Sequence, residues 1–136
     1  MARAWLLIGA LLGASGVALG AYHAHGLEKA IARPDVSAED VTKRMDNCAT
    51  AVRYQMYHVP AVLAIGILSL LCRSNLLNAA GVVFLLGLGG FAGGLYLYVF
   101  TGQMIWWLVP LGGLLLIVGW VMMFLAGISI KIARDF

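Results

Sequence analysis

Charged side chains are scarce in this sequence, and none of them falls within four long apolar stretches. Only 11% of the 136 residues are Asp, Glu, Lys or Arg, whereas 62% are hydrophobic. A typical soluble domain has about 25% charged residues. The uncharged stretches cover residues 5–22, 55–71, 76–100 and 106–130. This distribution excludes a soluble fold.

The alternating pattern of membrane β-strands is also missing. A helix needs about 20 mostly apolar residues to cross the hydrocarbon layer, and in lipid the backbone polar groups are satisfied only within helices or closed barrels. The sequence therefore predicts an all-α integral membrane protein, a single four-helix bundle over residues 1–136 in contact with the lipid bilayer. We expect its helices at approximately 4–24, 54–72, 76–100 and 105–130.

Cysteine is rare too, and its placement excludes an intrachain disulfide. Cys48 precedes the second apolar stretch and Cys72 ends it, so a membrane-spanning helix of roughly 25 Å would hold the two sulfurs far beyond disulfide reach. The net charge of +3 does not indicate nucleic acid as a partner, because the basic residues flank the apolar stretches or lie among acidic residues.

The one substantial polar segment, residues 26–53, predicts an amphipathic interfacial helix at approximately 38–53. Ser37 and Asp40 form a capping-box pattern at its start. The pairs Glu39/Lys43 and Asp40/Arg44 have the i,i+4 spacing that brings opposite charges together on a helix. Nothing in the sequence stops this helix before the second apolar stretch begins.

Basic residues give little information on orientation, because the two ends of the predicted helices carry similar numbers. The terminal side has Arg3, Arg73, Lys131 and Arg134, and the other has Lys29, Arg33, Lys43, Arg44 and Arg53. The second set is balanced by acidic residues in the polar segment. We therefore expect both termini in the cytoplasm.

Glycine is abundant, and its spacing predicts close helix packing. Small residues at four-residue spacing let membrane helices approach closely. The first stretch has such a face, and the third has the pairs Gly89/Gly93 and Gly90/Gly94, so we expect the first and third helices to pack together. The predicted packing residues are Gly9, Gly13, Gly16, Gly20, Gly90, Gly94, Pro110 and Gly113.

All three histidines and all five tyrosines fall at the same ends of the apolar stretches, which would gather them on one membrane face. Gln55 and His58 are three residues apart and can share a helix face directed into the bundle. Pro60 and Pro110 lie at comparable depths, and each is expected to release the carbonyl four residues earlier. The histidine, glutamine and tyrosine donors beside these carbonyls predict a polar pocket.

The histidines, tyrosines and glutamine on this membrane face have several possible interpretations. Aromatic residues gather at membrane interfaces without any binding role. A metal or haem site using His23, His25 and His58 is an alternative, although their spacing matches no metal-ligand motif. No nucleophile and base have a spacing that predicts catalysis. A pore or transporter is a further alternative. It would have to be built from several copies of the chain, because a monomer has no ionisable group near mid-membrane.

Four segments of the chain together resemble one family. They are Gly20-Ala21-Tyr22-His23-Ala24-His25-Gly26-Leu27, Thr50-Ala51-Val52-Arg53-Tyr54-Gln55-Met56-Tyr57-His58, Gly94-Leu95-Tyr96 with Thr101-Gly102, and Val109-Pro110-Leu111-Gly112-Gly113 with Gly119-Trp120. This pattern is similar to the domain-of-unknown-function 423 family of small membrane proteins, which includes transmembrane protein 256. The resemblance implies a four-helix integral membrane protein, in bacteria usually of the inner membrane, and implies no activity or cofactor.

Carried over position by position, the family pattern marks Gly20, His25, Gly26, Tyr54, Gln55, His58, Tyr96, Pro110 and Gly113. This chain departs from the pattern at His23, where a small residue is expected, at Arg53, where a neutral polar residue is frequent, and at Val59-Pro60. The segment 33–40 is also longer than in the shorter relatives. A site built on His23 would therefore be particular to this chain.

We interpret the chain as a non-enzymatic membrane protein, either a binding protein or an accessory subunit. Its site is expected on the loop side, the membrane face where the histidines and tyrosines gather. The expected partners are a lipid-soluble small molecule, another membrane subunit or a second copy of the chain. No metal is expected in the preferred interpretation. The candidate binding residues are His25, Arg53, Tyr54, Gln55, His58 and Tyr96.

Overall fold

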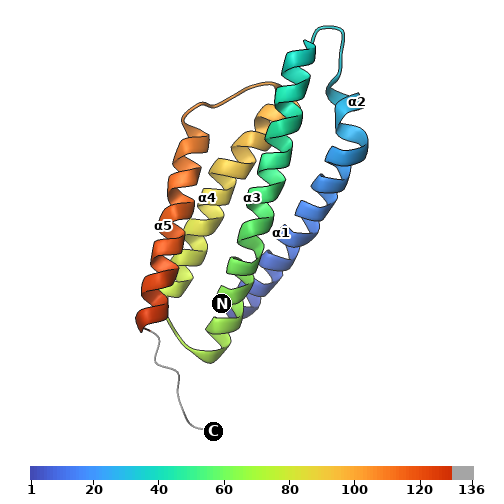
Figure 1. Ribbon diagram of the computed structural model, residues 1–136. Helices are drawn as coiled ribbons and strands as arrows, with labels where there is room; N and C mark the ends of the chain where they lie inside the picture. Colours follow the sequence, from blue (N-terminus) through green and yellow to red (C-terminus); the bar gives the residue numbers. More distant parts are fainter. Residues whose placement is uncertain (130–136) are drawn as a thin grey trace.

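The computed structural model describes residues 1–129, and these form helices joined by short connections (Figure 1). Within this range 88% of the residues are helical and none is in a strand. The elements are α1 (Ala2–Tyr22), the π-helix η1 (His23–Leu27), α2 (Glu28–Ile31), α3 (Ala38–Leu71), α4 (Asn75–Thr101) and α5 (Leu108–Ser129).

Four helices in the described part of the chain are long and apolar enough to cross a membrane: α1 with its continuation to Ile31, α3, α4 and α5. They confirm the prediction of an all-α membrane bundle. The N-terminus and the last turn of α5 lie at one end of the bundle, called here the terminal end (Figure 1). The α2–α3 and α4–α5 connections lie at the opposite end, called here the loop end.

Helix α3 runs without interruption from Ala38 to Leu71 and includes Pro60. Ser37 Oγ accepts the backbone N–H of Asp40 at 3.1 Å, which satisfies one of the free donors of the first turn. The polar segment before Gln55 and the apolar segment after it thus form one continuous helix. The first turns of α3 extend beyond the other helices at the loop end (Figure 1).

Helices α3 and α4 form the centre of the bundle, with α1 and α5 on opposite sides (Figure 1). The glycine face of α1 packs on α3: a Cβ at Gly9 would lie 2.6 Å from the Leu63 side chain, and one at Gly16 would lie 2.6 Å from Met56. Gly13 and Gly20 face Val59 and Val52 of the same helix. The prediction that the glycine faces of the first and third membrane helices pack on each other was therefore wrong.

The glycines of α4 that are buried pack mainly against α5. A Cβ at Gly90 would lie 2.9 Å from Gly112 Cα, and one at Gly112 would lie 2.1 Å from Phe91 N, so the two backbones meet here. Gly94 faces Leu108 and Val109 of α5, and Gly113 faces the Phe91 ring. Only glycine allows backbones to approach this closely.

Pro110 has a different role from the one expected. It lies in the first turn of α5, which begins at Leu108. A backbone N–H in the first turn has no partner within the helix, so proline removes no hydrogen bond there. Pro110 is exposed, and the expected release of a helical carbonyl by this residue was wrong.

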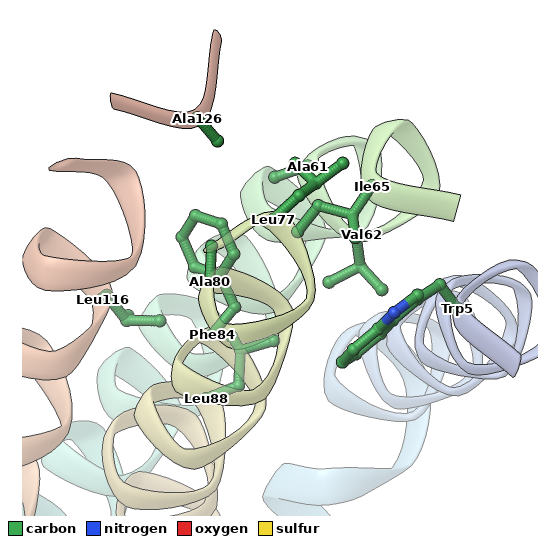
Figure 2. Packing of buried hydrophobic residues seen from close by; sticks show 10 residues of the cluster. All are labelled: Trp5, Ala61, Val62, Ile65, Leu77, Ala80, Phe84, Leu88, Leu116 and Ala126. Carbon is green, nitrogen blue, oxygen red and sulfur yellow. The ribbon is translucent and has the colours of Figure 1, made fainter. Parts of the chain in front are cut away.

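A buried apolar cluster extends through all four membrane helices towards the terminal end (Figure 2). Phe84 of α4 is completely buried within it and contacts Gly119 of α5. At the α1 side, Trp5 packs on Gly81, and its indole N–H donates to Asn78 Oδ1 at 2.8 Å. The members of the cluster are Trp5, Ala61, Val62, Ile65, Leu77, Ala80, Phe84, Leu88, Leu116 and Ala126.

Candidate functional site

Gln55 is the centre of a hydrogen-bond network that joins three helices. Its side chain is buried, and its Nε2 donates to the Leu12 carbonyl at 2.7 Å and to Ser15 Oγ at 2.9 Å. Its Oε1 accepts the Tyr96 hydroxyl at 2.9 Å. The network connects α1 to α4 through a side chain of α3. An unpaired amide would be costly inside a membrane, so these bonds favour this arrangement of the helices.

The Leu12 carbonyl fixes the direction of every bond in this network. A carbonyl oxygen can only accept, so the Gln55 nitrogen must face it and Oε1 must face Tyr96. Tyr96 is then the donor to Oε1. The Ser15 hydroxyl also donates to the Leu12 carbonyl, at 3.1 Å. All side-chain protons of Gln55, Ser15 and Tyr96 are therefore used within the protein.

A groove of about 290 Å³ lies between α1 and α4, with Gln55 at its polar end. Gly89 is exposed, and a Cβ added there would meet no atom within 4 Å, so the groove is open to the side of the bundle. None of the described residues that line it carries a charge. They are Leu12, Ser15, Gln55, Leu85, Leu88, Gly89, Ala92, Gly93 and Tyr96.

The polar and apolar ends of this groove have a defined order along the membrane normal. Ser15, Gln55 and Tyr96 lie on the loop side, since Tyr96 is five residues before the end of α4 at Thr101, or about 8 Å along the helix. Leu85 lies further along α4 towards the terminal end. The groove thus combines an uncharged polar end near one interface with an apolar continuation towards the membrane interior.

His58 is buried outside this groove, and both of its ring nitrogens have partners. Nδ1 lies 2.7 Å from the Tyr54 carbonyl, which can only accept, so Nδ1 carries the proton. Nε2 then accepts the indole N–H of Trp120 at 3.1 Å. The rings of His58, Phe84 and Trp120 lie 5.2–5.8 Å apart and form an aromatic cluster between α3, α4 and α5.

The other two histidines lie apart from His58, at the π-helix η1. His23 Nε2 lies 3.1 Å from the Met45 carbonyl, and His25 is exposed. Both line a shallow cavity of about 200 Å³ at the loop end. Among residues 1–129, no group of three or more His, Cys, Asp or Glu side chains has the arrangement to hold a metal ion. The structure does not bring His23, His25 and His58 together.

Two further candidates lie on the outer surface of α3. Arg53 is exposed. Tyr54 is also exposed, and its ring packs on Phe91 with 4.5 Å between centroids. Of the predicted binding residues, the groove therefore brings together only Gln55 and Tyr96.

A second polar cluster fastens the start of α3 to the end of α4. Arg44 forms an ion pair with Asp40 at 2.7 Å, as the i,i+4 spacing predicts, and Asp40 also accepts the Tyr98 hydroxyl at 2.6 Å. The Tyr98 hydroxyl and the Arg44 guanidinium lower the pKa of Asp40. Arg44 extends over Gly102, whose φ of 76° favours glycine.

Ser15 and the open glycines are the site residues that sequence reasoning missed. Ser15 is a single hydroxyl in an apolar stretch, yet it lies on the first helix at the same depth as Gln55. Gly89 and Gly93 were recognised as a small-residue pair, but were expected to be covered by a helix. A polar residue matched in depth on another helix is the signal that could have identified Ser15.

The family model described as "Protein of unknown function (DUF423)" matches residues 19–113. This chain belongs to that family. The DUF423 protein is 34% identical over 125 residues to a UPF0382 membrane protein of Staphylococcus aureus, covering 91% of this chain and 94% of the relative. It is 35% identical to one of Haemophilus influenzae, covering 89% and 90%, and 30% identical to one of Bacillus subtilis, covering 93% and 98%.

No solved structure matches this DUF423 protein. The relatives are named as membrane proteins, and together with the four apolar helices they establish an integral membrane protein. Neither their names nor the family description points to catalysis. The predicted resemblance to this family is confirmed.

Proposed function

We propose that this protein is a non-catalytic membrane protein that binds a lipid-soluble molecule in the groove between α1 and α4. The supporting observation is the combination of an open groove of about 290 Å³ with the buried Gln55 at one end, whose amide protons are both hydrogen-bonded within the protein. Small-molecule sites are typically apolar with a few fixed polar groups. A side chain larger than glycine at Gly89 or Gly93 would occupy this space.

The groove can be tested by filling it. Gly89→Leu places a side chain in the groove, whereas Gly127→Leu makes the same change on α5, where an added Cβ also meets no atom within 4 Å. Native mass spectrometry of the full chain from mild detergent should show one bound lipid-like molecule on the parent protein and on Gly127→Leu, but none on Gly89→Leu. Equal retention by both variants would contradict the proposal.

A second candidate function is that of an accessory subunit, and the outward position of Gly89 favours it. Gly89 and Gly93 have the four-residue spacing that lets another membrane helix approach closely. The partner would be a different membrane subunit or a second copy of the chain. The same mass measurement distinguishes this candidate, because a subunit would give a complex that Gly89→Leu breaks and Gly127→Leu preserves.

We further propose that the protein lies in a bacterial inner membrane with both termini in the cytoplasm. Arg3 and Arg73 at the terminal end support this orientation, because basic residues favour the cytoplasmic side. Many basic residues at the loop end are accompanied by acids, as in the pairs Lys43–Glu39 and Arg44–Asp40. A green fluorescent protein fused after Phe136 should fluoresce, and an alkaline phosphatase fused there should be inactive. The reverse result would overturn the orientation.

A further inference from the structure

We propose that the groove selects an uncharged amphiphile that carries a hydroxyl group, such as a long-chain alcohol, a prenol or a diacylglycerol. This inference rests on the proposed function and names the chemical class of its ligand. It is carried by the hydrogen-bond directions around Gln55. These directions follow from the Leu12 carbonyl, which can only accept.

The network has no proton left to offer a ligand. Both Nε2 protons of Gln55 are bound to Leu12 and Ser15, and the hydroxyl protons of Ser15 and Tyr96 are bound to the Leu12 carbonyl and to Gln55. What is left is acceptor capacity: a second lone pair on Gln55 Oε1 and lone pairs on the two hydroxyl oxygens. The ligand must therefore supply the donor.

The lack of charge in the groove restricts the ligand further. No Asp, Glu, Lys, Arg or His is among the described residues that line it, so an ionised headgroup would enter without a counter-charge from them, at a high cost in free energy. A ligand that offers only acceptors, such as a ketone, a quinone or an ether, would place its oxygens against the lone pairs of the Gln55 and Tyr96 oxygens and form no hydrogen bond. A neutral hydroxyl group supplies a donor and carries no charge, so it meets both requirements.

The orientation of the groove fits an amphiphile of this kind. Its polar end lies near the loop-side interface, and Leu85 and Leu88 line its continuation towards the membrane interior. A lipid alcohol in the loop-side leaflet likewise has its hydroxyl at the interface and its chain directed towards the membrane interior. A groove of about 290 Å³ is at the lower end of ligand-site volumes, which are typically ~300–1,000 Å³. It would enclose the hydroxyl and the first part of the chain, with the remainder in lipid.

Photolabelling of the full chain in phosphatidylcholine vesicles tests this selectivity. The probe is a hexadecanol that carries a diazirine on its chain, and the competitors are 1-hexadecanol, its methyl ether and hexadecyl phosphate. The expected labelling lies between Leu85 and Tyr96 of α4. Because one net hydrogen bond is at stake, 1-hexadecanol should compete roughly three- to tenfold better than the ether. Hexadecyl phosphate should compete no better than the ether.

The outcomes separate this inference from the proposed function. Labelling of the groove with equal competition by alcohol and ether, or with stronger competition by the phosphate, overturns the hydroxyl selectivity but retains the groove as a binding site. Labelling that is the same in Gly89→Leu as in Gly127→Leu overturns both. These comparisons need no change at Gln55.

A variant at Gln55 tests the source of the selectivity. Gln55→Leu removes the acceptor of Tyr96, whose hydroxyl then becomes free to donate to an ether or a ketone. The preference for alcohol over ether should then fall to about equality. A preference that persists at its original ratio in the folded variant would overturn the assignment to this network.

Discussion

The Gln55 Nε2 atom lies 2.7 Å from the Leu12 carbonyl oxygen, so a side chain of α3 is bonded directly to the backbone of α1. Most contacts between these two helices are apolar and would tolerate small shifts. The bond to Leu12 favours one relative position of the two helices, and the same side chain accepts the Tyr96 hydroxyl of α4 at 2.9 Å.

Gln55→Leu should destabilise the bundle. The change leaves the Tyr96 and Ser15 hydroxyls without their glutamine partner, and hydrogen bonds between membrane helices contribute about 0.6–1.7 kcal/mol each. We expect a loss of about 1–2 kcal/mol, measured by unfolding in a fixed lipid and detergent mixture. The same change at the exposed Gln103 serves as the control and should have little effect. Equal stabilities of the two variants would refute the structural role of Gln55.

The contact between His58 and Trp120 should appear as a measurable coupling between α3 and α5. Nε2 of His58 accepts the Trp120 indole N–H at 3.1 Å. A double-mutant cycle with His58→Phe and Trp120→Phe should give a coupling free energy of about 0.5–1.5 kcal/mol in unfolding experiments. A parallel cycle with Trp106, which is 80% exposed, should give none. Additive effects in the first cycle would exclude the hydrogen bond.

Gly112 should tolerate alanine far less well than its neighbour Gly113. A Cβ at Gly112 would lie 2.1 Å from the Phe91 backbone nitrogen, whereas a Cβ at Gly113 would lie 3.4 Å from the movable Phe91 ring. We expect Gly112→Ala to cost about 1–3 kcal/mol or more by forcing α4 and α5 apart. Gly113→Ala should be neutral or slightly stabilising, because alanine favours the helix. Thermal unfolding of both variants checks this order.

Asp40 should contribute to stability in a pH-dependent way. It lies in the polar first turns of α3, outside the apolar segment, and hydrogen bonds from Tyr98 and Arg44 lower its pKa in the folded protein. A lowered folded pKa means that the contribution is fully present above the unfolded pKa and is lost as pH falls through the folded pKa. Asp40→Asn should therefore reduce the loss of stability on acidification.

The control for this titration is Asp46→Asn, which changes an exposed carboxylate of the same helix. Unfolding should be followed from neutral to acidic pH in both variants and in the parent protein. Asp46→Asn should retain the acid dependence of the parent protein. If Asp40→Asn retains it as well, the contacts with Tyr98 and Arg44 do not stabilise the fold.

The candidate site was predicted from the sequence only in part. Gln55 and Tyr96 were predicted because polar side chains within apolar segments need partners inside the bundle. His25 and Arg53 were included because they lie at the same loop end, but depth in the membrane does not determine the direction of a side chain around its helix axis. His58 is buried as expected, yet its partner is Trp120, whose indole extends from a different helix.

The sequence alone determined the four membrane helices, the all-α class and the position of the polar loop end. These follow from the length of the uncharged stretches and from the cost of unpaired backbone groups in lipid, which are local properties of the chain. The tertiary structure alone decided that the α1 glycines meet α3, that Gly90 meets Gly112, and that Gly89 is left uncovered. Small residues permit close approach by any neighbouring helix without specifying which one, so only the packing of the whole bundle selects the partners and leaves the groove open.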